Sequence, residues 1–260
     1  MTVVSGRKSG VLGADEGARP DSADPLVYGD PQPGPNVGRA TILGVSNAPL
    51  ALQLAARVER SDPPAVSAVC AGAALATIAM LDDERSAPDG PWHHAVAAWN
   101  GARIRKIVRR GRGSDWRRAI EVDGVTVARD GAEVRAFVPG PVDQVPRPVS
   151  KLQIQSSELP EESTVEELPE IEGLIVLVTP QVEMTWGKRA AQCAHAAQRA
   201  WLGADEARRD AWTAAGRPLT VVHPDQRLWA ATVPHADVRI RDAGYTEIPS
   251  GTNTTIALWR

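Results

Sequence analysis

Polar side chains occur at helical spacing in the stretch 186–200, which reads WGKRAAQCAHAAQRA. Four of them follow one another by four, three and four positions and so share one face of a predicted helix: Lys188, Gln192, His195 and Arg199. A lysine in the first helical turn is electrostatically unfavourable, because the N-terminus of a helix is already positive. The stripe therefore indicates a functional site, with a solvated helix face as the alternative for each residue taken alone.

A second concentration of polar residues lies in 239–254, which reads RIRDAGYTEIPSGTNT and contains two glycines at predicted turns. It follows a predicted strand, and ligands of open α/β sheets bind beyond the carboxyl ends of strands. We expect Lys188 and Asp242, which each follow the end of a strand, to converge there. A lysine beside a carboxylate favours the charged form of both groups.

The elements that must position these residues alternate between strand and helix. The apolar run 173–178 does not alternate in polarity, which is typical of a strand buried on both faces. The second half predicts strands at 173–179, 218–223, 237–241 and 253–259, and helices at 187–202, 204–215 and 225–232. This alternation predicts an α/β sandwich with a mostly parallel sheet.

The first half predicts a similar set of elements: an apolar helix at 65–81, a helix ending near Trp99, strands at 103–108, 125–129 and 148–153, and a short helix at 115–120. Residues 1–40 are rich in Gly, Pro, Asp and Ser, which predicts a mostly disordered tail. Glutamates and two prolines fill 156–172, which is typical of an extended acidic linker. The expected domains are 41–155 and 173–260.

The two halves repeat several features in the same order. The segment 68–74, AVCAGAA, matches 191–197, AQCAHAA, in all its alanines and its cysteine. Ala-Trp recurs, a second Trp follows 17 residues later in each half, and an Arg-Asp pair comes after that: Trp99, Trp116 and Arg129-Asp130 against Trp212, Trp229 and Arg241-Asp242. We therefore predict a tandem duplication. The first copy lacks the polar stripe, since Ala65, Val69 and Gly72 stand where the second has Lys188, Gln192 and His195.

Composition sets further bounds on the chain. Its 260 residues suit one large domain or two small ones, and its net charge of −3 does not by itself indicate a partner. No apolar run approaches the roughly 18–20 residues that a membrane span needs, and the N-terminus has no apolar core typical of a secretory signal. Cys70 and Cys193 lie in helical patterns, so we expect buried free thiols and a reducing cytoplasm. Packing explains both cysteines better than catalysis does.

Several motifs resemble the type II peptidyl-tRNA hydrolase family. They are 187–197 (GKRAAQCAHAA), 241–246 (RDAGYT) and 251–254 (GTNT), and the segment 212–218 (WTAAGRP) is similar to the family's W-x-x-x-G-x-P. The resemblance covers about 173–259. It implies an α/β/α sandwich around a small mixed four-stranded sheet, and the duplication then implies two such domains in tandem. It also implies hydrolysis of the ester that joins a peptide to the terminal ribose of tRNA, without a metal or other cofactor.

The resemblance assigns roles to particular residues. The catalytic groups it implies are Lys188, Asp242, Thr246 and Thr254, and the substrate-binding groups are Gln192, His195, Gly187 and Thr252. Two segments depart from the family pattern, 179–182 (TPQV) after the first strand and Glu247 in place of glutamine. These departures favour the alternative, a non-catalytic tRNA-binding or protein-interaction descendant of the fold.

A basic cluster lies in the first copy, with eight Arg and Lys residues between positions 103 and 118. Phosphate contacts give affinity for nucleic acids without sequence preference, so Arg109, Arg110 and Arg112, together with Arg199, are candidates for tRNA binding. A solvated loop, or pairing with the acidic linker, is the alternative. The first copy could also cover hydrophobic surface in place of a second subunit, so we expect either a monomer with intramolecular domain pairing or a homodimer.

Overall fold

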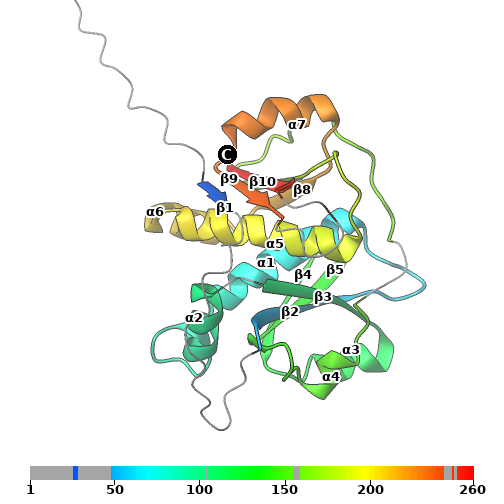
Figure 1. Cartoon of the computed structure of the whole chain (residues 1–260), viewed down its shortest axis with the longest axis vertical. Coiled ribbons are helices and arrows are strands. Elements are labelled where there is room, and N and C mark those ends of the chain that lie inside the picture. The colour runs from blue at the N-terminus through cyan, green and yellow to red at the C-terminus, as the bar shows by residue number, and fades with distance from the viewer. Residues whose placement is uncertain (1–25, 29–47, 103–104, 155–158, 243–247, 249–250) are drawn as a thin grey trace, which may run out of the picture.

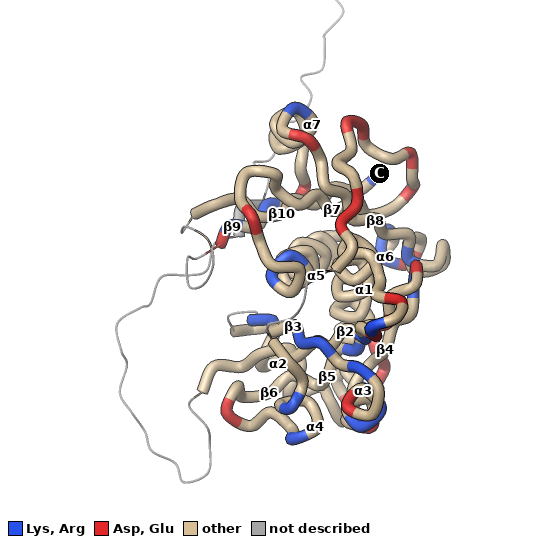
Figure 2. The backbone as a smooth tube through the Cα atoms, turned by 90° about the vertical axis from the view of Figure 1, so that its right-hand side faces the viewer, with Lys and Arg blue, Asp and Glu red and all other residues tan. Residues whose placement is uncertain are grey.

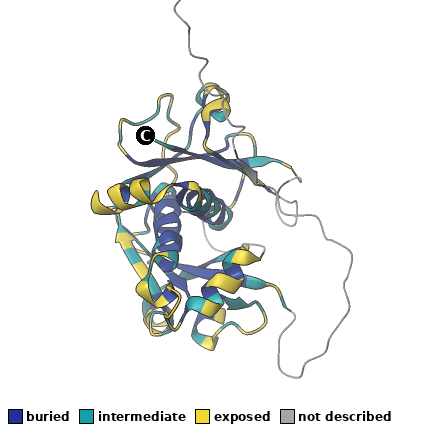
Figure 3. Cartoon of the chain, turned by 90° about the vertical axis from the view of Figure 1, so that its left-hand side faces the viewer, coloured by how far each residue is buried: buried dark blue, intermediate teal, exposed yellow. Residues whose placement is uncertain are grey.

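The computed structural model describes residues 26–28, 48–102, 105–154, 159–242, 248 and 251–260. Within these ranges the chain forms two small mixed sheets, and two long helices, α1 and α5, lie between them (Figure 1). Figure 3 shows that buried residues run along these central helices and along the strands of the two sheets. The predicted class, two α/β units in tandem, is confirmed.

The C-terminal unit begins with β7 and ends with β10. Its elements are β7 (Leu174–Val178), α5 (Trp186–Gly203), α6 (Glu206–Ala214), β8 (Leu219–Val222), α7 (Gln226–Thr232), the 3-10 helix η2 (Val233–His235), β9 (Val238–Arg241) and β10 (Asn253–Trp259). The strand order is β9-β10-β7-β8, with β7 and β8 parallel and β10 antiparallel to both of its neighbours. The expected mostly parallel sheet is thus wrong, because β10 lies between β9 and β7 and runs antiparallel to both.

The N-terminal unit has the same strand order and the same sequence of connections. Its elements are β2 (Leu50–Arg57), α1 (Val66–Leu81), the 3-10 helix η1 (Glu84–Ser86), α2 (His93–Gly101), β3 (Arg105–Gly111), α3 (Gly113–Ala119), β4 (Gly124–Arg129), β5 (Ala132–Phe137), β6 (Gly140–Pro141) and α4 (Arg147–Ser150). The order is β4-β5-β2-β3, again with one parallel pair, β2 and β3. Each of these four strands therefore has a counterpart in the other unit, whereas β6 is a short additional strand that pairs with β2.

Two sequence predictions in the first unit are wrong. The segment 148–153 contains the end of the short helix α4 and no strand, which fits the preference of Pro148 for the first turn of a helix. The strand that completes the sheet is β5, which the sequence reading missed. Its alternation was visible, since Ala132, Val134 and Ala136 are buried between more exposed polar residues.

The segment before β2 contributes one strand to the far sheet. Strand β1 (Leu26–Tyr28) pairs in parallel with β9 and so extends the edge of the C-terminal sheet (Figure 1). The predicted disorder of residues 1–40 is therefore wrong for these three residues, and the remainder of that range lies outside the described residues.

The acidic segment between the units contacts both of them. The Glu162 carboxylate accepts hydrogen bonds from the backbone N–H of Ser67, at 3.2 Å, and from its hydroxyl. It thereby caps α1, whose own N-cap residue, Ala65, has no side chain that could do so. Val165 forms an isolated bridge with Pro224 of the C-terminal unit. The segment is thus docked along part of its length.

The two units meet where α1 packs against α5. The contacts are reciprocal, because α5 also touches β3 of the first unit and α1 touches β8, its counterpart, in the second. Cys70 and Cys193 are buried free thiols, as expected. Burial, with a further contribution from the neighbouring Cys70, raises the pKa of the Cys193 thiol well above its usual value. Within the described ranges, no helix is long and apolar enough to span a membrane.

Candidate functional site

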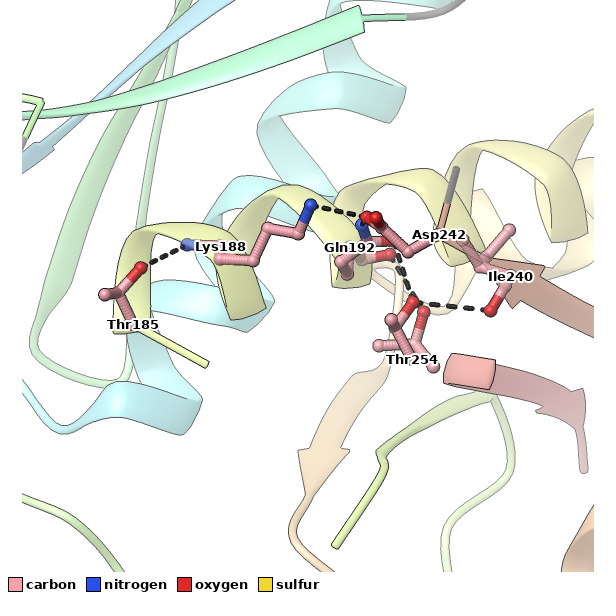
Figure 4. A network of polar contacts seen from close by, with 7 residues as sticks. Thr185, Lys188, Gln192, Ile240, Asp242 and Thr254 are labelled. Carbon is pink, nitrogen blue, oxygen red and sulfur yellow. Dashed lines mark hydrogen bonds and ion pairs between the residues drawn. The ribbon is translucent and has the colours of Figure 1, made fainter. Parts of the chain in front are cut away.

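Lys188 and Asp242 form an ion pair at one end of the C-terminal sheet. Lys188 lies in the first turn of α5, where the Thr185 hydroxyl accepts a 3.3 Å hydrogen bond from its backbone N–H. Asp242 follows the last residue of β9 and accepts a hydrogen bond from Lys188 Nζ on its Oδ2 atom (Figure 4). The lysine side chain is 15% exposed and the aspartate 7%. The predicted convergence of the two strand ends is confirmed.

A polar chain behind this pair holds the carboxylate. Gln192 donates from Nε2 to the same Asp242 oxygen over 2.9 Å, and the Thr254 hydroxyl donates to Gln192 Oε1, also over 2.9 Å (Figure 4). The Thr254 hydroxyl also lies 3.3 Å from the backbone oxygen of Ile240. Charge-assisted hydrogen bonds of this kind are stronger than neutral ones. One carboxylate oxygen is therefore fixed by a cation and an amide.

The backbone around Asp242 adds to this rigidity. Its N–H donates to the Thr252 carbonyl over 3.0 Å, and the N–H of Gly251 donates to the Asp242 carbonyl over 2.7 Å. These bonds close the two ends of the loop between β9 and β10. Gly251 has φ +83°, a left-handed conformation that strongly favours glycine. The G-T-x-T motif thus supplies a turn, a carbonyl and the Thr254 hydroxyl.

The other implied residues have different positions. Thr254 and Gln192 are buried, and their side chains form the polar chain behind Asp242. Thr252 contributes its carbonyl, and Gly187 packs near Val108 of β3, where an added Cβ would lie 3.9 Å from the Val108 oxygen. Thr246 lies outside the described residues.

The predicted polar stripe of α5 divides into two sites. His195 is seven residues beyond Lys188, about 10 Å along the helix axis, and there α5 faces the N-terminal unit. His195 Nδ1 lies 3.1 Å from Nζ of Lys106 in β3, and Lys106 also donates to the Gln198 side chain. Gln198 in turn donates to Asn100 over 2.7 Å. His195 thus belongs to the contact between the units and not to the Asp242 site.

This second cluster is basic and buried. Burial lowers the pKa of the His195 imidazole well below its usual value, and the positive charges of Lys106, Lys188 and Arg199 lower it further. Burial also lowers the pKa of Lys106 well below its usual value, with a contribution from Arg199. The sequence reading counted Lys106 among the basic residues but did not single it out. The available signal was strand alternation: Lys106 follows the exposed Arg105 in β3, so its side chain points to the opposite, buried side.

The basic cluster of the first unit is only partly at the surface. Arg109 is buried and bonds to Gln53 and to the Leu152 carbonyl, over 2.9 and 3.1 Å, so its role is structural. Arg110 donates to the Gln153 side chain, and Arg112 lies at the N-terminus of α3. Figure 2 shows the basic residues of β3 and α3 on the same side of the molecule as the N-terminal turn of α5. The Arg109 guanidinium is therefore held inside the N-terminal unit, and its contact with tRNA stays a prediction.

Within the described ranges, no three His, Cys, Asp or Glu side chains lie together as metal ligands would.

Comparisons with known proteins bear on the second unit. Residues 173–259 match the family model described as Peptidyl-tRNA hydrolase PTH2. No curated protein and no solved structure matches the chain. The match supports a type II peptidyl-tRNA hydrolase domain in the C-terminal half, the half that carries Lys188 and Asp242.

Proposed function

We propose that the C-terminal unit hydrolyses the ester between a peptide, or an N-blocked aminoacyl group, and the terminal ribose of tRNA. The observation that carries this proposal is the Lys188–Asp242 pair, held by Gln192 and Thr254 inside the segment that matches the family model. Fixed charges at the position where charge develops are the largest single source of catalysis in many enzymes.

The reaction adds water to the ester carbonyl carbon and breaks the bond from that carbon to the ribose oxygen. Asp242 accepts a hydrogen bond from the attacking water and takes its proton, which then passes to the departing ribose oxygen. Lys188, the more exposed partner of the pair, stabilises the oxyanion that forms on the carbonyl. The products are the free peptide acid and tRNA with a free hydroxyl.

We infer a positioning role for the two buried side chains. Gln192 and Lys188 both donate to Asp242 Oδ2, so the carboxylate cannot rotate without breaking these two bonds. Thr254 holds Gln192 in turn by donating to its amide oxygen. A carboxylate held in one orientation needs little reorganisation during the reaction. Thr254 therefore acts through Gln192 and Asp242.

The N-terminal unit is, in this proposal, a degenerate copy that lacks the site and contributes to tRNA binding. Strand β3 is at the edge of its sheet, and Val108 of that strand lies next to Gly187, one residue before Lys188. Arg105 is exposed, and Arg110 and Arg112 are partly exposed, so their guanidinium groups lie within reach of a phosphate backbone. The tRNA would then lie across both units.

Release of peptide from a model peptidyl-tRNA by the purified chain tests the proposal. Turnover should persist in the presence of a metal chelator and fall at least 100-fold in Lys188→Ala, the loss typical of removing an oxyanion donor. Equal turnover in wild type and Lys188→Ala would reject the site. Undetectable turnover by the wild type, with retained tRNA binding, would favour a non-catalytic tRNA-binding protein.

A further inference from the structure

The outer edge of β9 lies next to the Asp242 site and is occupied by a segment of the same chain. The other edge of β9 pairs with β10, and β1 is the last strand of the sheet on this side. Leu26, Val27 and Tyr28 stand opposite Val238, Arg239 and Ile240. Strand β1 is only three residues long, and the contact that places it in the sheet is its backbone pairing with β9.

The direction of β1 shows which end of an added strand would lie near Asp242. It runs parallel to β9, so both strands point their carboxyl ends toward Asp242, which directly follows β9. A strand that continued in the register of β1 would place its first further residue opposite Arg241 and its second opposite Asp242. Paired strands lie about 4.8 Å apart. The carbonyl end of such a strand would therefore come to the Lys188–Asp242 pair.

The peptide of a peptidyl-tRNA has the polarity that this edge requires. Its carboxyl end carries the ester, so a peptide parallel to β9 brings its ester carbonyl to Asp242 and extends its amino end away along β9. We propose that the edge of β9 binds the peptide of the substrate as an added strand, in the place now taken by residues 26–28. This inference rests on the proposed hydrolase function and makes β1 an internal competitor.

Backbone pairing also fits the chemistry of the substrate. Strand addition to a sheet edge gains its affinity from main-chain hydrogen bonds, which every peptide sequence except proline can supply. A hydrolase that must accept many peptide sequences is served by recognition of this kind. The site would then distinguish substrates by the length and hydrogen-bonding capacity of the peptide, and an N-blocked single residue would reach Asp242 without using the edge.

The test compares two substrates on three proteins: the wild-type chain, a β1 variant and a tail control. In the double variant Val27→Pro/Tyr28→Pro, β1 loses two backbone donors and its pairing with β9. We expect the KM for a tetrapeptidyl-tRNA to fall by about threefold to tenfold, since an internal competitor acts at a high effective concentration. The KM for N-acetyl-aminoacyl-tRNA and both kcat values should remain unchanged. Val3→Pro/Val4→Pro, in the same tail, is the matched control and should behave as wild type.

A binding measurement separates failure of this inference from failure of the hydrolase proposal. A fluorescein-labelled tetrapeptide of alternating Ala and Val with a free carboxylate is titrated with wild type, the β1 variant and the tail control. Tighter binding by the β1 variant alone, weakened when a proline replaces an internal residue of the peptide, supports edge binding even if no turnover is found. Equal binding by all three proteins, or a KM independent of peptide length and of β1, overturns it.

Discussion

The two units share a scaffold and differ in what lies on it. In each unit a tryptophan indole N–H donates to the carbonyl six residues later: Trp99 to Arg105 over 3.0 Å, and Trp212 to Pro218 over 2.8 Å. The strand orders correspond, and the second tryptophan of each unit, Trp116 or Trp229, is buried beneath the sheet face away from the central helices. The fold therefore persists without the polar site.

The site depends on two local differences. The first is the loop after the third strand of the unit: Asp130 and Gly131 form a two-residue turn with positive φ between β4 and β5, whereas the loop that begins at Asp242 has eleven residues before β10. The Asp130 side chain is 69% exposed, while that of Asp242 is buried. The tight turn between β4 and β5 leaves the Asp130 carboxylate in solvent and does not direct it toward α1. An Arg-Asp pair after the third strand is therefore not sufficient to form the site.

The second difference is the central helix. α1 is buried almost throughout, because it packs between its own sheet and α5, and it carries no charged residue. α5 instead is amphipathic and presents Lys188 and Gln192 to the loop after β9. Burying an unpaired charge costs several kcal/mol. The environment of α1 therefore excludes the stripe that α5 carries.

The largest effect should come from the matched aspartates. We expect Asp242→Asn to lower kcat for peptidyl-tRNA about 100- to 1,000-fold, because the amide neither takes the proton from water nor balances Lys188. Asp130→Asn should leave kcat within about twofold, since the exposed Asp130 faces solvent. Single-turnover measurements of peptide release would show the difference. Comparable losses in the two variants would mean that the carboxylate of the second unit has no special role.

The helices offer a second contrast, in stability. Gly72 of α1 stands where α5 has His195, and a Cβ at Gly72 would lie 2.7 Å from Cγ2 of the buried Val134. We expect Gly72→Ala to lower the free energy of unfolding by about 1–3 kcal/mol, the usual cost of overpacking. Gly101→Ala, at a position where nothing lies within 4 Å, should change it by less than about 1 kcal/mol. Urea denaturation would measure both, and a neutral Gly72→Ala would show that Val134 can shift to accommodate a Cβ at this position.

The sequence predicted the second unit well and the first less well. In residues 173–259 each predicted helix and strand is confirmed within two residues. In the first unit, 148–153 was predicted as a strand although Pro148 favours the first turn of a helix, and the alternation of β5 was overlooked. For the site, the pairing of Lys188 with Asp242 followed from the rule for strand ends. The burial of Thr254 and the turn of His195 toward Lys106 could not be predicted, because both depend on contacts between distant elements.

The contact between the units should depend on pH through Lys106. Burial holds its pKa well below the usual value, so the folded chain releases this proton at a lower pH than the unfolded chain does. The stability contributed at this position must therefore rise with pH until the unfolded pKa, about 10.4, is reached, with a slope of up to about 1.4 kcal/mol per pH unit. We expect Lys106→Met to gain stability relative to wild type at pH 6, and this advantage to shrink steadily as the pH rises toward about 10, as measured by urea denaturation. A difference that does not vary with pH would show that Lys106 stays charged.

The smallest effect should appear in tRNA binding by the first unit. Each phosphate contact contributes about one unit to the slope of log K against log salt, so Arg110→Gln/Arg112→Gln should reduce that slope by about two and weaken binding a few-fold at moderate salt. Arg118→Gln is the control, because Arg118 already pairs with Asp115 on the surface of α3. Filter binding at salt concentrations from about 50 to 300 mM gives the slopes, because counterion release dominates the salt dependence in this range. An unchanged slope in the double variant would confine tRNA recognition to the C-terminal unit, and the N-terminal unit would then serve only as a scaffold for α5.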